Sequence, residues 1–171
     1  MAERQGLVTI KGNPLTLLGQ EVKVGDPAPD FEVLDNDLNP FRFSLRRGQV
    51  VIIASVPSLD TPVCDFETHR FNEEASKLGP KVAILTISMD LPFAQKRWCG
   101  AAGVANLQTL SDHRHAAFGL AYGVLIKELR LLARAVFVVD APGTIQYLQL
   151  VKELTQEPDY DAVLQAVRKV V

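Results

Sequence analysis

The chain has 171 residues, a length that fits one folded domain with a hydrophobic core. Its 18 basic and 20 acidic side chains give a net charge of −2, which does not favour nucleic acid or an anionic membrane as a partner. The first residues lead into no apolar run of signal-peptide length, and charged side chains interrupt the most apolar region, residues 116–139. We therefore expect one domain over residues 1–171 in a cytoplasmic protein, where a structural disulfide is not expected.

The N-terminal part predicts a β-hairpin at about residues 7–18, because two short apolar runs flank the turn signal Gly12-Asn13-Pro14. The next stretch, residues 25–31, contains two prolines and is expected to be extended. Residues 41–43 are predicted to form a short strand.

From residue 50 onward, strand and helix patterns alternate. The predicted strands are 50–55, 81–88, 129–139 and 144–150, and the predicted helices are 62–78, 92–99 and 160–170. This order is typical of an α/β fold with a mixed sheet and helices on both faces. We expect a thioredoxin-like fold, with a central mixed sheet flanked by helices and an N-terminal β-hairpin.

Cys64 lies in the first turn of the predicted helix 62–78, directly after a buried strand and a turn. The first N–H groups of a helix have no intrahelical partner and the helix dipole favours an anion there, so this thiol is biased toward the reactive thiolate. The same position lies on an apolar stripe with Phe71, Ala75 and Leu78. A buried, unreactive cysteine is therefore the alternative interpretation.

Thr61 and Pro57 each allow two interpretations. Thr61 precedes Cys64 by three residues, where it can cap the helix with Pro62 at the first helical position. Its hydroxyl could also lie beside the sulfur and bridge it to a substrate oxygen. Pro57 could end the strand, or it could cover the thiolate and limit access of water.

Three acidic residues, Asp60, Asp65 and Glu67, crowd this helix start and oppose ionisation of the thiol. A helix terminus stabilises a nearby anion by only about 0.3–1 kcal/mol. A reactive Cys64 therefore needs a cation from another part of the chain.

Arg134 is the candidate for that cation. In the strand-like run 132–138, alternation places it on the same face as Leu132, Val136 and Val138. An arginine on an inward face needs an anionic partner, and a thiolate would serve. The alternative is that Arg134 lies at an edge and extends into water. Arg70 is a poorer candidate, because its helical angle turns it away from Cys64.

Cys99 ends the predicted short helix 92–99, just before Gly100 and Gly103. This helix has few residues and glycine at its end, so it should unwind at low cost. Two cysteines can form a disulfide only when their Cα atoms come within about 4.4–6.8 Å. Joining Cys64 to Cys99 would therefore require movement, and the alternative is that Cys99 only packs.

The run Pro57-Ser58-Leu59-Asp60-Thr61-Pro62-Val63-Cys64-Asp65 resembles the active-site signature of peroxiredoxins, Pro-x3-Thr-x2-Cys. Residues 85–95, 107–112 and 131–140 extend the similarity to nearly the whole chain. The chain is most similar to the bacterial thiol peroxidase branch, the atypical 2-Cys peroxiredoxins. Two positions depart from the usual pattern of that branch: Trp98 stands where Phe is expected, and His69 where Arg is commoner. Neither is expected to touch the chemistry.

The resemblance implies that Cys64 is the peroxidatic thiol, oxidised to sulfenic acid by hydrogen peroxide or by alkyl or lipid hydroperoxides. It implies that Cys99 is the resolving thiol, which forms a transient Cys64–Cys99 disulfide that thioredoxin reduces. Thr61 and Arg134 would hold the thiolate and the substrate, and Pro57 would shield the pocket. The resemblance further implies a homodimer and chemistry without a metal or an organic cofactor.

Other interpretations of the thiols remain open. A disulfide reductase normally needs Cys-x-x-Cys, and Glu67 stands three residues after Cys64. A cysteine hydrolase would need a histidine base, and a metal module would combine both cysteines with histidines at a spacing that fits no common site. The candidate bases for a hydrolase are His69, His113 and His115, and the candidate metal ligands beside the cysteines are His113 and His115. A non-catalytic binding protein of thioredoxin fold is the last alternative.

Overall fold

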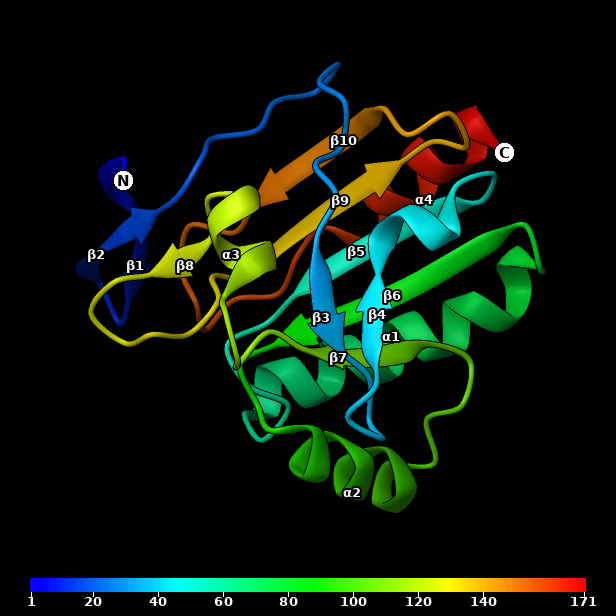
Figure 1. Ribbon diagram of the computed structural model, residues 1–171, viewed down its shortest axis with the longest axis horizontal. Coiled ribbons are helices and arrows are strands. Elements are labelled where there is room, and N and C mark those ends of the chain that lie inside the picture. The colour runs from blue at the N-terminus through cyan, green and yellow to red at the C-terminus, as the bar shows by residue number, and fades with distance from the viewer.

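The computed structural model describes residues 1–171 and contains two β-sheets (Figure 1). The large sheet consists of β3 (Glu32–Leu34), β4 (Pro40–Arg42), β5 (Val50–Ser55), β6 (Val82–Ser88), β7 (Gln108–Ser111), β9 (Ala135–Val139) and β10 (Ile145–Leu150). Its strand order is β10-β9-β5-β6-β7-β3-β4. β5, β6 and β7 run parallel, and the remaining neighbours pair antiparallel. The predicted mixed sheet of an α/β, thioredoxin-like fold is confirmed.

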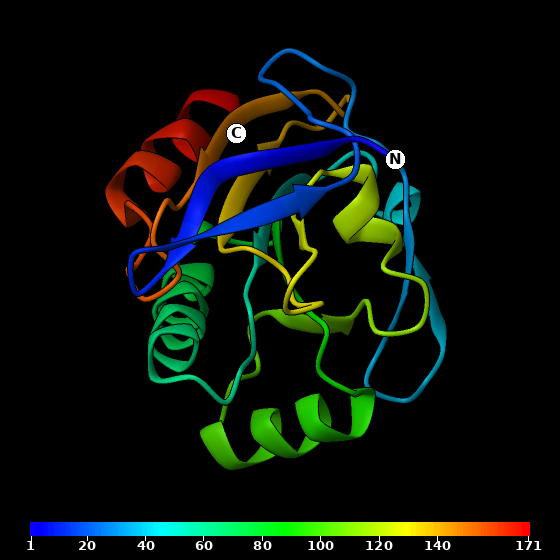
Figure 2. The same cartoon turned by 90° about the vertical axis from the view of Figure 1, so that its left-hand side faces the viewer.

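Helices cover both faces of this sheet. They are α1 (Pro62–Leu78), α2 (Pro92–Ala102), α3 (Ala117–Ala121) and α4 (Tyr160–Val170), with a short 3-10 helix, η1, at Phe43–Arg46. Figure 2 shows α1 and α4 on one side of the sheet and α3 on the other. None of these helices has the combination of length and apolar character that a bilayer crossing requires.

The alternation of side chains along β5 divides the core into two parts. Ile52 and Ala54 face α1 and α4, where they join a buried cluster with Phe71 and Val163. The opposite face forms the larger cluster, which includes Val51, Ile53, Leu85, Ile87, Phe118 and Tyr122. Helix α1 is therefore fixed against one side of the sheet by its apolar stripe.

The small sheet joins the N-terminal hairpin, β1 (Glu3–Ile10) and β2 (Asn13–Leu18), to β8 (Leu125–Ile126). The predicted hairpin is confirmed, but β1 begins at Glu3 rather than Leu7. The residues of this extension are mostly polar, so the apolar pattern of the sequence does not indicate it. The pairing of β1 with β2 is irregular near Gly6, whose φ is 73°. The hairpin contacts the segment before α4, because Thr9 N donates to Lys152 O at 2.7 Å and Leu154 N donates to Thr9 O at 2.9 Å.

The predicted strands 41–43, 81–88 and 144–150 each shift by one residue at one or both ends, to β4, β6 and β10, and two other predicted elements differ by three residues or more. The predicted strand 129–139 is shortened to β9, because the chain reverses before it: Ile126 N donates to Leu131 O, and Arg130 has a φ of 51°. The predicted helix 92–99 continues as α2 through Gly100 to Ala102. It ends at Gly103, whose left-handed φ of 69° suits glycine and whose N–H donates to Cys99 O.

The aromatic cluster beneath α3 gives a test of the fold. The Phe118 side chain is fully buried, with ring centroids 5.0 Å from Phe31 and 4.6 Å from Tyr122. We expect Phe118→Ala to lower the free energy of unfolding by about 3–5 kcal/mol, measured by urea denaturation, because it leaves a cavity in the core. The matched control, Phe93→Ala at a side chain 67% exposed, should change it by less than about 0.5 kcal/mol. Equal effects of the two variants would contradict this packing.

Candidate active site

Cys64 lies in the first turn of α1, immediately after the loop that leaves β5. Thr61 is the N-cap, with an extended backbone (φ −84°, ψ 145°), and its Oγ1 accepts a hydrogen bond from Cys64 N at 3.3 Å. The same hydroxyl donates to Ser58 O at 3.1 Å. Thr61 therefore caps the helix, and its one hydroxyl proton is engaged by the loop rather than by the sulfur.

Arg134 reaches Cys64 from the residue before β9. Its Nη2 donates to Cys64 Sγ at 3.2 Å, and its side chain is only 1% exposed. The alternative, that Arg134 extends into water from an edge, is wrong. The same guanidinium donates to Leu154 O, from Nε at 3.2 Å and from Nη2 at 2.8 Å. A buried, permanent cation thus lies in contact with the thiol.

Glu67 is the second partner of Arg134, and it was not expected in that role. It follows Cys64 by less than one helical turn, is fully buried, and accepts a hydrogen bond from Arg134 Nη1 at 2.6 Å through Oε2. Its Oε1 has no hydrogen-bond partner. The sequence carried a usable signal, because spacing of three residues on a helix places two side chains on neighbouring positions of one face.

Burial raises the pKa of Glu67 to about 7, although the Arg134 charge opposes this shift. Burial alone would lower the pKa of Arg134, but the charges of Glu67 and Cys64 outweigh it and raise that pKa instead. Both pKa values are raised, so the carboxyl can become neutral at moderate pH while the guanidinium stays charged. Arg134 is therefore the fixed charge of the site, and Glu67 is the group whose charge varies.

The other two acidic residues near the helix start form no ion pair or hydrogen bond with Arg134. Asp60 is exposed, and Asp65 Oδ1 accepts a hydrogen bond from Trp98 Nε1 at 2.9 Å. Of the three carboxylates expected to oppose the thiolate, only Glu67 contacts the cation of the site.

An apolar wall and a polar anchor hold the loop before α1. Cys64 packs in a small buried cluster with Val56 and Leu59. Pro57, which follows Val56 in the sequence, is also buried. Asp90 fixes this loop from the end of β6, since it accepts hydrogen bonds from Ser58 Oγ at 2.7 Å and from Leu59 N at 2.9 Å. The anchoring by Asp90 was not expected, because no local pattern connects residues so far apart in the chain.

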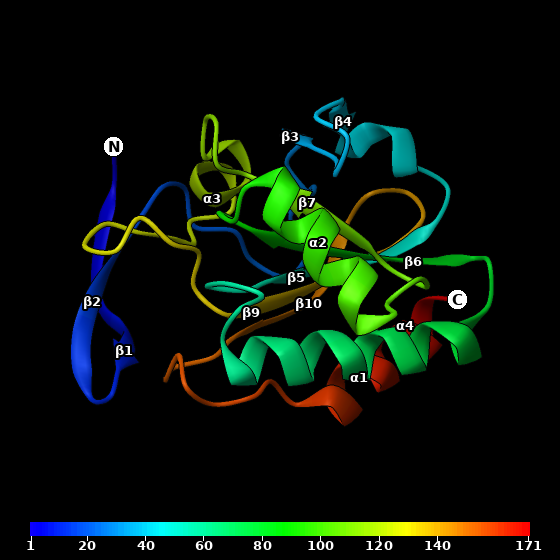
Figure 3. The same cartoon turned by 90° about the horizontal axis from the view of Figure 1, so that it is seen from below.

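Cys99 lies on α2, and Figure 3 shows this helix passing alongside α1. Both cysteines are free thiols. Cys99 Sγ is 3.2 Å from Thr109 Oγ1, whereas Cys64 Sγ contacts Arg134, so the two sulfurs share no partner. Cys99 is half-buried, while Cys64 is fully buried.

No histidine hydrogen-bonds to the Cys64 sulfur, whose one side-chain partner is Arg134. His69 Nε2 lies 3.7 Å from Asp65 Oδ1, and His113 and His115 lie in the connection between β7 and α3. No group of three or more His, Cys, Asp or Glu side chains is arranged to hold a metal ion. The geometry therefore offers a nucleophile and a cation, and it provides no base of the kind that a cysteine hydrolase requires.

Comparisons with known proteins agree with this geometry. Residues 23–164 match the protein family described as Redoxin. The thiol peroxidase of Oceanobacillus iheyensis is 58% identical over 162 residues, covering 95% of this chain and 98% of that protein. The thiol peroxidase of Bacillus subtilis strain 168 is 56% identical over 164 residues, covering 96% and 98% of the two chains.

A solved structure extends the similarity to the fold. The peroxiredoxin-like protein from Aquifex aeolicus superimposes with a TM-score of 0.91 at 44% identity, covering 98% of this chain and 99% of that one. The sequence and the fold therefore both match known proteins over at least 95% of the chain. The first-turn cysteine in contact with a buried arginine is consistent with the family of those proteins. The chain belongs to the redoxin family and, within it, to the thiol peroxidases.

Proposed function

We propose that this thiol peroxidase reduces hydrogen peroxide and organic hydroperoxides through Cys64, with Cys99 as the resolving thiol and thioredoxin as the reductant. We also propose that it works without a metal or organic cofactor, as a cytoplasmic homodimer. The observation that carries the proposal is the 3.2 Å contact between Arg134 Nη2 and Cys64 Sγ in a buried site.

In the first step, the Cys64 thiolate attacks the terminal oxygen of the hydroperoxide. The O–O bond breaks, Cys64 becomes a sulfenic acid, and the other oxygen leaves with a proton as water or an alcohol. The Arg134 guanidinium and the first amides of α1 stabilise the anion before attack. Thr61 would orient the substrate oxygen once it rotates from Ser58 O, and buried Pro57 would limit access of water.

In the second step, the Cys99 thiol attacks the Cys64 sulfenic acid. A water molecule leaves and a Cys64–Cys99 disulfide forms. A thioredoxin dithiol then reduces this disulfide by thiol–disulfide exchange, which returns both thiols. The proposed step requires α2 to move, because Cys99 contacts Thr109 in the reduced structure.

The charge balance of the site supports reactivity at neutral pH. Arg134 supplies one positive charge, and two acids, Cys64 and Glu67, compete for it. A buried site with one cation favours one anion, because a second would be uncompensated in a region of low dielectric constant. With a pKa of about 7, Glu67 can be neutral when Cys64 is the thiolate. Glu67 can then ionise once oxidation of Cys64 has removed the negative charge of the thiolate.

A stoichiometric peroxide experiment tests the cycle. One equivalent of hydroperoxide should convert the reduced chain into a species two hydrogens lighter, with a peptide bridge between Cys64 and Cys99 detected by mass spectrometry. The Cys99→Ser variant should instead accumulate the Cys64 sulfenic acid, and Cys64→Ser should consume no peroxide. A thiol pair that persists after peroxide treatment would refute the proposed function.

Exchanging Glu67 for its neutral isostere tests the charge balance. Because Glu67 has a raised pKa in the folded state, its contribution to stability is complete below the unfolded pKa of about 4.5 and is lost as the pH rises through about 7. We expect the wild type to lose on the order of 3 kcal/mol more than Glu67→Gln over this window, measured by urea denaturation at several pH values. Identical pH dependence of the two proteins would contradict the raised pKa.

The same variant should also hold more of Cys64 as thiolate at neutral pH, because Arg134 would have no competing carboxylate. Ultraviolet absorbance of the thiolate measures this fraction, and Cys64→Ser supplies the baseline. An unchanged thiolate fraction in Glu67→Gln would show that the two acids do not compete.

A further inference from the structure

The two positions that depart from the usual thiol peroxidase pattern, His69 and Trp98, meet at one carboxylate. Trp98 Nε1 donates to Asp65 Oδ1 at 2.9 Å, and His69 Nε2 lies 3.7 Å from the same oxygen. The rings of His69 and Trp98 have centroids 5.6 Å apart. Trp98 also packs against the buried cluster that contains Cys64. The residue directly before Cys99 therefore ties α2 to the first turns of α1.

The first half of α2 is anchored by buried contacts. Pro92 and Gln95 are the only buried residues of this helix. Gln95 Nε2 donates to Ser88 Oγ at 3.0 Å and to Leu110 O at 2.8 Å, and Ser88 Oγ donates to Asp90 at 2.7 Å. Because these contacts are shielded from water, the helix is expected to stay formed up to Gln95.

The second half of α2 has weaker attachments. After Gln95, its side-chain hydrogen bonds and ion pairs are the exposed pair of Lys96 with Asp37, the hydrogen bond of Trp98 with Asp65, and the contacts of Cys99 with Thr109 and, at 3.9 Å, with Asn36 Nδ2. Gly100 lies inside this half and Gly103 ends it. Glycine lowers the cost of unwinding, so few contacts keep this segment helical.

We propose that Asp65 and Trp98, flanked by His69, are positioning residues for the resolving step: their contact holds the second half of α2 in place and limits how fast Cys99 reaches oxidised Cys64. This inference rests on the proposed function. Cys99 can approach Cys64 only after residues 96–103 unwind from the anchor at Gln95, and the Asp65–Trp98 hydrogen bond breaks in that movement.

The contact consequently sets the fate of the Cys64 sulfenic acid. In one reaction the Cys99 thiol displaces water and forms the disulfide. In the other, a second hydroperoxide molecule transfers its oxygen to the sulfenic sulfur, which becomes a sulfinic acid while the peroxide leaves as water or an alcohol. Slower unwinding favours the second reaction, so the Asp65–Trp98 contact makes the enzyme more sensitive to excess peroxide.

Three single variants separate the contact from general effects on α2. Asp65→Ala removes the acceptor, Asp65→Asn retains an amide oxygen that can accept from Trp98, and Lys96→Ala breaks the exposed ion pair on the same helix. We expect Asp65→Ala to accelerate disulfide formation roughly fivefold, the size of one partly exposed hydrogen bond. Asp65→Asn and Lys96→Ala should stay near the wild-type rate.

Trp98 is the only tryptophan, so its fluorescence after mixing with peroxide follows the movement of α2 directly. Mass spectrometry at excess peroxide should then find less Cys64 sulfinic acid in Asp65→Ala than in the wild type. Trp98→Phe, which keeps a ring but loses the N–H donor, should show the same decrease. An unchanged rate in Asp65→Ala, or equal acceleration in Lys96→Ala, would overturn the inference.

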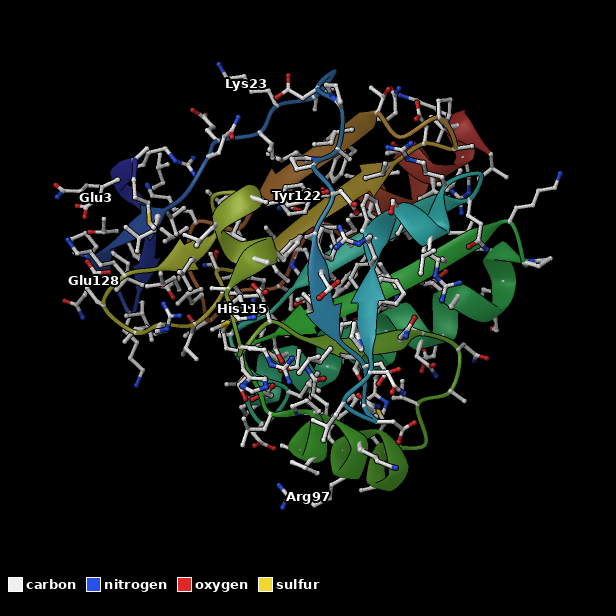
Figure 4. All side chains as sticks on the ribbon, in the orientation of Figure 1. Glu3, Lys23, Arg97, His115, Tyr122 and Glu128 are labelled. Atoms are coloured by element: carbon white, nitrogen blue, oxygen red, sulfur yellow. The ribbon has the colours of Figure 1, made fainter.

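A measurement without peroxide distinguishes failure of this inference from failure of the proposed function. Lys96 and Arg97 are trypsin sites in the segment expected to unwind, and Figure 4 shows Arg97 projecting away from the body of the protein. In the reduced protein, trypsin should cut after these residues faster in Asp65→Ala and Trp98→Phe than in wild type or Asp65→Asn. Equal cleavage would exclude the positioning role even if Cys64 reacts with peroxide as proposed.

Discussion

Burial of the Arg134 guanidinium is the constraint on which the rest of the site depends. A charge that cannot reach water must be compensated by hydrogen bonds and anions at short range, or it destabilises the fold. Arg134 obtains this compensation from Cys64 and Glu67 on α1 and from the carbonyl of Leu154 before α4. Two separate parts of the chain, α1 and the segment before α4, are thereby held at fixed positions around one planar group, and the Cys64 sulfur is one of the atoms so positioned.

The N-terminal hairpin contributes to the same constraint from a distance. The Leu154 carbonyl can accept hydrogen bonds from Arg134 only if the segment before α4 is fixed in position. The backbone of Thr9 fixes it through two hydrogen bonds, one to Lys152 O and one from Leu154 N. The Glu153 carboxylate adds to this attachment by accepting hydrogen bonds from Thr9 Oγ1 at 3.0 Å and from Gly12 N at 2.9 Å. Residues near the start of the chain therefore help to orient the cation that contacts Cys64.

Periodic elements were predictable from the sequence, and short elements were not. β5, α1 and α4 have the predicted bounds, because their apolar spacing is sustained over several residues. β3, β7 and α3 contain only three to five residues, and tertiary contacts decide whether such segments form. The same limit applies to the site. Cap geometry placed Cys64 and alternation pointed to Arg134, whereas Glu67 was interpreted only as a charge opposing the thiolate. The spacing along a helix identifies a face, but it does not reveal which distant cation that face meets.

The two cysteines meet opposite physical requirements in the proposed cycle. A nucleophile that depends on a cation must stay in place, and Cys64 is held by the Thr61 cap, by the buried bond from Thr68 Oγ1 to its carbonyl at 2.7 Å, and by Arg134. A resolving thiol must travel, so it belongs on an element with few buried contacts. A helix anchored at Gln95 and ending in glycine supplies such an element next to the rigid one. Since the disulfide must also be accessible to a protein reductant, the partner that moves should be the one nearer the surface, and Cys99 is that partner.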